Sequence, residues 1–121
     1  MILADTSVWV DHFRSTNPQL RDVLIEERLL THPMVVGELA CGNLPARDET
    51  LFSLQQLPAA LVAQDDEVLR FIEEKRLWGS GLGWIDAHLL ASALLTGCHL
   101  WTLDRRLHIA ARELRVSYPR P

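Results

Sequence analysis

The chain has 121 residues, the size of one domain with a single core, so we treat residues 1–121 as one domain. Its composition, 48% hydrophobic and 23% charged, excludes an intrinsically disordered chain. The longest apolar stretch, residues 87–95, is too short for a bilayer, which needs about 20 residues. With no basic leader before an apolar segment, we expect no membrane span, no secretion signal and a cytoplasmic location. The two cysteines, Cys41 and Cys98, lie far apart in sequence, and we expect both to be reduced core residues.

The net charge of −4 argues against a protein that holds nucleic acid by bulk attraction. The charge is unevenly distributed, however. Residues 99–121 carry five arginines and two acids, a local charge of +3, so the rest of the chain carries −7. Any attraction for a polyanion is therefore expected near the carboxyl end.

The first half of the chain alternates short apolar runs with helical patterns. Pro18 and Pro33 suit the first turn of a helix, and Gly42 suits the position after a last turn. These signals predict, in chain order, a strand at Ile2–Ala4, a helix from Thr6 or Ser7 that carries Trp9 and Phe13, a helix from Pro18 to about Glu27, a strand at residues 28–31, a helix from Pro33 that Gly42 ends, and a helix from about Ala46 to Gln56.

The second half continues the alternation. Three acids at residues 65–67 suit the start of a helix, where the macrodipole favours negative charge. The pattern predicts a strand at residues 60–63, a helix from Asp65, a loop at residues 79–83, a helix at Trp84–Thr96 that Gly97 ends, a strand at residues 99–103, and a helix with Leu107, Ala111 and Leu114 on one face. Strands separated by helices form parallel βαβ units. We therefore predict an α/β fold, a three-layer α/β/α sandwich around a short, mainly parallel sheet covered on both faces.

Two aspartates follow predicted strands directly. Asp5 comes after the first strand, and Asp104 comes after a late one. Ligands of parallel sheets bind outside the carboxyl ends of the strands, so both aspartates are expected at the ligand-binding edge. A role as turn or cap residues is the alternative for each.

Two further acids lie within predicted helices, with mainly apolar residues three and four positions away. Glu38 has Met34, Val35 and Cys41 among these neighbours, and Asp86 precedes Leu89 and Leu90 on its face. The helix dipole alone could explain Asp86, which lies in a first turn. A buried pair with an arginine is the alternative for Glu38, because an unpaired buried carboxylate is costly.

These four acids are predicted to converge, because helices that follow parallel strands begin near the same edge. Carboxylates within ~5 Å of one another repel by roughly 3 kcal/mol per pair at an effective dielectric constant of ~20. A cation is needed to neutralise such a cluster, and ligands that are all oxygen select Mg²⁺ or Mn²⁺. A site of this kind suits phosphodiester hydrolysis by metal-activated water, with Asp5, Glu38, Asp86 and Asp104 as catalytic residues.

Four segments resemble the successive acidic motifs of PIN-domain ribonucleases, and in particular of the VapC-type toxins of toxin–antitoxin pairs. The segments are ADTSVW at residues 4–9, GEL at 37–39, WIDAHLLA at 84–91 and WTLD at 101–104. The resemblance implies a Mg²⁺-dependent endoribonuclease with metal ligands Asp5, Asp86 and Asp104. It also implies a homodimer or toxin–antitoxin hetero-oligomer, and a cognate antitoxin whose tail blocks the acidic cleft.

The resemblance also implies that Thr6 or Ser7 and Thr102 form hydrogen bonds around the metal site. The sequence departs from many relatives two residues after the last motif, where Arg106 replaces a further acid. This departure puts a second metal ion in doubt and leaves the first unaffected. Arg105, Arg106 and Arg112 could hold RNA phosphates beside the site, or could simply form a solvated helix face. The five histidines show no metal-ligand spacing, so we interpret them as structural or surface residues.

Two other functions compete with a nuclease. A phosphatase of the haloacid dehalogenase kind also places an aspartate after its first strand, but it needs a second acid where Ser7 stands and a late lysine, whereas the only lysine is Lys75. A non-catalytic module could use the acids merely to receive a basic partner segment. The carboxylates of Glu38 and Asp86 are both expected to point along an apolar helix face, and this position favours metal chemistry over such a module.

Overall fold

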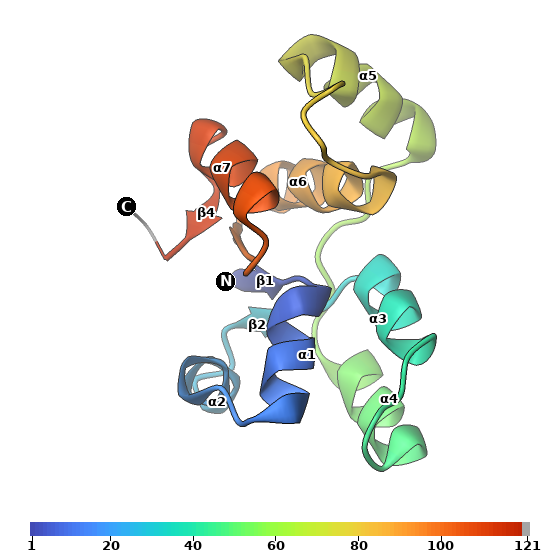
Figure 1. Cartoon of the computed structure of the whole chain (residues 1–121), viewed down its shortest axis with the longest axis vertical. Helices are drawn as coiled ribbons and strands as arrows, with labels where there is room; N and C mark the ends of the chain where they lie inside the picture. Colours follow the sequence, from blue (N-terminus) through green and yellow to red (C-terminus); the bar gives the residue numbers. More distant parts are fainter. Residues whose placement is uncertain (120–121) are drawn as a thin grey trace.

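The computed structural model describes residues 1–119, and its centre is a short, fully parallel sheet. The strands are β1 (Ile2–Ala4), β2 (Leu29–Leu30), β3 (His99–Trp101) and β4 (Ser117–Tyr118). Within the described residues their order in the sheet is β2-β1-β3-β4, so β1 and β3 lie in the middle. Figure 1 labels β1, β2 and β4. The register pairs Ala4 with Trp101, so the carboxyl ends of β1 and β3 lie side by side.

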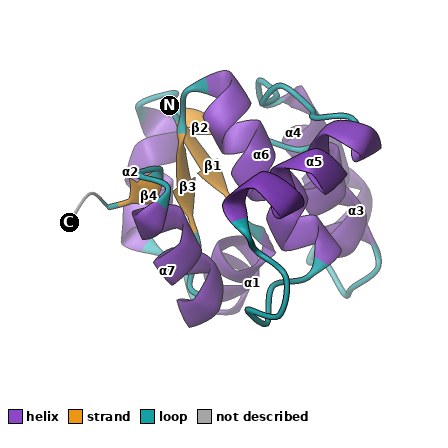
Figure 2. Ribbon diagram, turned by 90° about the horizontal axis from the view of Figure 1, so that it is seen from above, coloured by secondary structure: helices purple, strands orange, loops and turns teal. Residues whose placement is uncertain are grey.

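The sheet is buried on both faces. All three residues of β1 are at most 1% exposed, with no alternation between buried and exposed side chains. Such continuous burial is expected of a parallel sheet with helices on either side. Figure 2 shows two helices, α2 (Pro18–Ile25) and α7 (Arg105–Glu113), on one side of the strands. It shows α5 (Asp65–Lys75) and α6 (Trp84–Thr96) on the other side. The predicted three-layer α/β/α arrangement is confirmed.

The helices begin and end at residues of the expected types. Asn17 caps α2 by accepting from the Leu20 N–H, Pro18 and Pro33 occupy first helical positions, and Gly97 ends α6 in the left-handed region with φ +75°. The described helices are α1 (Thr6–Arg14), α2 (Pro18–Ile25), α3 (Pro33–Ala40), α4 (Arg47–Gln56), α5 (Asp65–Lys75), α6 (Trp84–Thr96) and α7 (Arg105–Glu113). No helix in this part of the chain is long and apolar enough to cross a membrane.

The strands differ from the prediction in three respects. Residues 60–63 form no strand, because Leu61 and Val62 point to solvent; the segment before them makes a single parallel bridge from Ala59 to Thr31. The strand β4 was not predicted, since two residues carry too little pattern. The predicted strand at residues 99–103 ends at Trp101, which leaves Thr102 at the carboxyl edge. Both cysteines are free, as expected, and Cys98 is buried, but the expected core position was wrong for Cys41, which is exposed at the end of α3.

Candidate active site at the carboxyl edge of the sheet

Asp5 is the central residue of this edge. Asp5 follows β1 directly, and its backbone N–H donates to the Trp101 carbonyl at 2.9 Å. Asp5 is only 6% exposed. One carboxylate oxygen accepts from the Ser7 backbone N–H at 3.0 Å and from the Ser7 hydroxyl at 2.5 Å, and the other accepts from the Thr102 hydroxyl at 2.5 Å. Side chains from both central strand ends therefore hold one buried carboxylate.

The environment of Asp5 raises its pKa. Burial is the largest cause, and the hydrogen bonds from Ser7, Thr102 and the Val8 backbone lower the pKa only partly. The ionised side chain is therefore costly in the isolated protein. A cation placed against it would favour the ionised form and offset that cost.

Thr102 connects Asp5 to Asp104. Its hydroxyl donates to Asp5 and accepts from the Asp104 backbone N–H at 3.0 Å, while the Ser7 hydroxyl accepts from the Leu103 N–H at 2.9 Å. The Asp104 side chain is exposed and accepts from the Leu107 N–H at 3.0 Å, at the start of α7. This network joins the loops that follow β1 and β3.

Glu38 reaches the same edge from α3. The Thr6 hydroxyl, in the first turn of α1, donates to the Glu38 carboxylate at 2.7 Å. The expectation that Glu38 points along an apolar face was wrong: Glu38 is exposed, while its neighbours Val35 and Leu39 are buried. The apolar stripe of α3 lies beside Glu38 and turns toward the core, which leaves the carboxylate free to approach α1.

Asp86 is the third residue of α6 and is half-buried. Its carboxylate turns back to accept from the Gly83 N–H at 2.9 Å. The Asp86 carboxylate therefore caps the start of its own helix. This agrees with the alternative interpretation, in which the helix start alone explains an aspartate in the first turn.

The four carboxylates do not form a single metal-binding cluster. Within residues 1–119, no three acidic, histidine or cysteine side chains are placed to hold a single ion, so the predicted convergence within ~5 Å was wrong. The physical reason is visible in the contacts. Unneutralised carboxylates repel, and Asp86 and Asp104 each satisfy an oxygen with a backbone N–H at a helix start instead.

The chemistry of the donors nevertheless fits a hard divalent ion. No salt bridge within the described residues involves Asp5, Glu38, Asp86 or Asp104, so an arginine neutralises none of them. The available ligand atoms are carboxylate and hydroxyl oxygens, the types that Mg²⁺ and Mn²⁺ prefer. The arginine-paired alternative for Glu38 is thereby excluded for this part of the chain.

The predicted RNA-binding arginines all lie on the exposed surface of α7. Arg105 and Arg106 occupy its first turn, directly after Asp104, and Arg112 lies in its last turn. The Arg106 guanidinium crosses Gly81, where an added Cβ would lie 2.7 Å from its nitrogen. The loop that precedes α6 is therefore packed against the start of α7.

Two buried histidines connect the helices behind this edge. His32 is 0% exposed; its Nδ1 accepts from the Met34 N–H at 3.1 Å, and its Nε2 lies 3.0 Å from the Ser92 hydroxyl. His88 is 1% exposed, with its Nε2 3.0 Å from Asp65. Burial, and secondly the nearby His88, lower the pKa of His32 to about 4. Neither position could be singled out from a pattern in the sequence, because each histidine stands alone.

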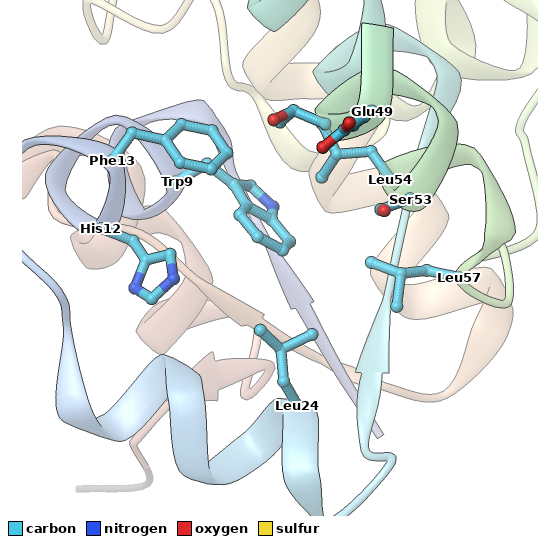
Figure 3. Close-up of a pocket in the computed structure, with 9 residues that line it drawn as sticks. Trp9, His12, Phe13, Leu24, Glu49, Ser53, Leu54 and Leu57 are labelled. Atoms are coloured by element: carbon cyan, nitrogen blue, oxygen red, sulfur yellow. The ribbon is translucent and has the colours of Figure 1, made fainter. Parts of the chain in front are cut away.

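Two hollows flank α1. One, of about 360 Å³ between α1, α2 and α4, is lined by Trp9, Phe13 and Leu24 among others and by none of the four site carboxylates (Figure 3). The other, of about 510 Å³, lies between α1, α3 and the loop to α4, and Thr6 and Glu38 form part of its wall. We call this second hollow the Glu38 groove; its lining comprises Thr6, Val10, Phe13, Arg14, Glu38, Leu39 and residues 42–45.

Comparison with known proteins identifies the family to which the chain belongs. The PIN domain family model matches residues 2–113, so the chain belongs to the PIN-domain family. Within that family it is of the VapC type: it is 46% identical over 118 residues to Ribonuclease VapC32 of Mycobacterium tuberculosis, in strains CDC 1551 / Oshkosh and ATCC 25618 / H37Rv alike, covering 97% of this chain and 95% of the relative. The crystal structure of PAE2754 from Pyrobaculum aerophilum shares the fold, with a TM-score of 0.64, 21% identity, and coverage of 89% of this chain and 82% of that one.

Proposed function

We propose that the protein is a Mg²⁺-dependent endoribonuclease that acts in the cytoplasm as the toxin of a toxin–antitoxin pair. The observation that carries the proposal is the buried Asp5 carboxylate at the carboxyl edge, held by Ser7 and Thr102 and paired with no cation among the described residues. The ribonuclease name of the relative with 46% identity supports the choice of RNA as substrate.

Each residue of the edge has a distinct role in this proposal. Asp5, Asp86 and Asp104 would provide the oxygen ligands for Mg²⁺ or Mn²⁺ once the carboxylates of Asp86 and Asp104 leave their helix-start hydrogen bonds. A bound divalent ion supplies Lewis acidity, lowering the pKa of an attacking water and neutralising phosphate charge. Glu38, whose carboxylate accepts a hydrogen bond from the Thr6 hydroxyl, would accept a proton from the attacking water. Ser7 and Thr102 fix the orientation of Asp5, and Arg105, Arg106 and Arg112 hold RNA phosphates.

The VapC-type relationship also supports an antitoxin partner. A basic segment of that partner would complement the unpaired carboxylates and block RNA. We further propose that the chain works as a homodimer or as a toxin–antitoxin hetero-oligomer.

The test compares RNA cleavage by the wild type with Mg²⁺, with excess EDTA, and with Mg²⁺ restored. We expect cleavage only in the first and third conditions. Asp5→Asn should abolish cleavage, while its unfolding free energy without metal stays within ~1 kcal/mol of the wild type, because one costly charge is removed. Asp66→Asn on α5, the same change at an exposed position, is the matched control and should cleave normally. Undiminished cleavage in EDTA would show the metal mechanism to be wrong.

A non-catalytic acidic module remains the contrasting function. It predicts no cleavage of any RNA with Mg²⁺ or Mn²⁺, together with tight capture of a basic peptide by the wild type. A phosphatase is disfavoured, because the residue 7 side chain is a hydroxyl that donates to Asp5, where such an enzyme needs a second acid.

A further inference from the structure

The Glu38 groove opens directly beside the candidate active site. Its wall includes Glu38 and Thr6, the pair whose hydrogen bond links α3 to the start of α1. In Figure 1, α1 lies alongside α3. The residues that line the groove come from these two helices and from the loop that leads to α4. Its volume of about 510 Å³ falls within the ~300–1,000 Å³ of small-molecule sites. The groove is therefore large enough for one nucleotide next to the reacting phosphate.

Two polar side chains of the groove are free to bind a ligand. Arg14 and Asn43 are exposed, and neither makes a hydrogen bond or an ion pair within residues 1–119. An asparagine amide carries both donors and an acceptor, the combination that recognises a base edge, and a guanidinium suits a phosphate.

The groove also offers apolar surface for a base. Phe13 lines both hollows beside α1, and its ring stacks on Trp9 with centroids 5.8 Å apart and planes inclined by 27° (Figure 3). Leu44 and Pro45 contribute apolar surface from the loop that leads to α4. Single-stranded RNA is commonly recognised by bases that pack on aromatic side chains, and such a packing surface is present here.

We propose, on the basis of the proposed ribonuclease function, that the Glu38 groove binds the nucleotide next to the scissile phosphate of single-stranded RNA. Its base packs against Phe13, Asn43 contacts the base edge, and Arg14 contacts a backbone phosphate. The free guanidinium favours RNA over a basic peptide, since Arg14 would repel the cationic segment that the acidic edge attracts. The groove thus sets which base flanks the cleavage site.

The experiment uses a single-stranded RNA library, randomised in sequence and cleaved with Mg²⁺. Base frequencies at each position around the cut are read for the wild type, Asn43→Ala, Arg14→Gln and the control Arg70→Gln. Arg70→Gln removes the same charge from an exposed position on α5, far from α1 in Figure 1. All three substitutions affect exposed side chains, and thermal unfolding verifies that each variant folds.

We expect Asn43→Ala to relax the base preference at one position beside the cut. It should raise KM about tenfold with kcat nearly unchanged, because the groove contacts a nucleotide that does not react. Arg14→Gln should raise KM and flatten its salt dependence while the preference stays, and Arg70→Gln should change neither.

Three results would overturn the proposal. If Asn43→Ala cleaves with an unchanged base preference, the groove does not read the flanking base, although the ribonuclease function stands. If both variants cleave RNA like the wild type but lose capture of an arginine-rich peptide, the groove is a peptide site. If the wild type cleaves no RNA under any metal condition, the proposed function fails as well, a result that the library experiment distinguishes from the first two.

Discussion

At the scale of single residues, the site aspartates act as helix caps as well as candidate ligands. Asp5 accepts from the Ser7 and Val8 N–H groups, Asp104 from the Leu107 N–H, and Asp86 from the Gly83 N–H. Each bond satisfies a backbone donor that a helix start leaves free. Binding of an ion by Asp86 or Asp104 therefore competes with a hydrogen bond that already stabilises the fold.

Sequence reasoning located these residues better than it described their surroundings. Asp5 and Asp104 could be assigned to the edge because each follows a predicted strand; Asp5 comes directly after β1, and Asp104 comes three residues after the end of β3. The exposure of Glu38 could not be predicted, because the boundary between the buried and solvated sides of α3 depends on how α1 packs against it. Arg14 and Asn43 carried no signal, since only the folded chain brings both to the same groove.

His32 gives a prediction about pH. Its pKa is lowered from 6.5 to about 4, so the unfolded chain takes up a proton before the folded one does. Its contribution to stability is complete above pH 6.5 and is lost as the pH falls toward 4, up to ~3 kcal/mol. Urea unfolding of the metal-free protein between pH 7 and pH 4 measures this loss.

The control for this prediction is His32→Gln, which removes the titrating group. The variant should lose less stability than the wild type across the same pH range. Asp5 acts in the opposite sense, because its raised pKa makes acidification stabilising, but it contributes equally to both proteins. If the unfolding free energy of the two proteins changed equally with pH, His32 would not be the cause of the loss of stability.

At the scale of elements, the positions of proline and glycine in the sequence predicted the helix boundaries well. Pro18, Pro33 and Gly97 mark boundaries in the structure as they did in the sequence. The strands were harder to predict, because strands of two or three residues in a parallel sheet show no alternation. Residues 60–63 were mistaken for such a strand: the run is apolar throughout, yet it lies outside the ladder.

The helix ends allow a paired stability prediction. Gly97 closes α6 at φ +75°, so Gly97→Ala should lower the unfolding free energy by ~1 kcal/mol, although no atom obstructs the new Cβ. Gly37 lies inside α3, with open space around its Cβ position, so Gly37→Ala should raise stability by ~0.5–1 kcal/mol. Chemical denaturation of both variants checks these opposite signs. A loss of stability in Gly37→Ala would contradict the account.

At the scale of the whole molecule, charge is divided between an acidic edge and a basic helix beside it. The chain carries −4 overall, yet Arg105 and Arg106 begin α7 directly after Asp104. Such a division would let a polyanion approach carboxylates that would otherwise repel it. Overall composition concealed this feature, and the local charge count indicated it.

The basic start of α7 gives the last prediction. Arg105→Ala combined with Arg106→Ala should weaken RNA binding and reduce the slope of log K against log salt by ~1.4, if each arginine contacts one phosphate of a single strand. Binding is measured on the Asp5→Asn background, so that RNA is not cleaved, at several salt concentrations. An unchanged slope would mean that the two arginines do not touch the backbone.

The double use of the site aspartates affects how the protein loses activity. An asparagine keeps an oxygen that can accept the same helix N–H, and a single nucleotide change converts an aspartate codon to an asparagine codon. Chains inactivated in this way are expected to remain folded. They would persist in the cell and compete with active copies for shared protein partners, instead of being degraded as misfolded material.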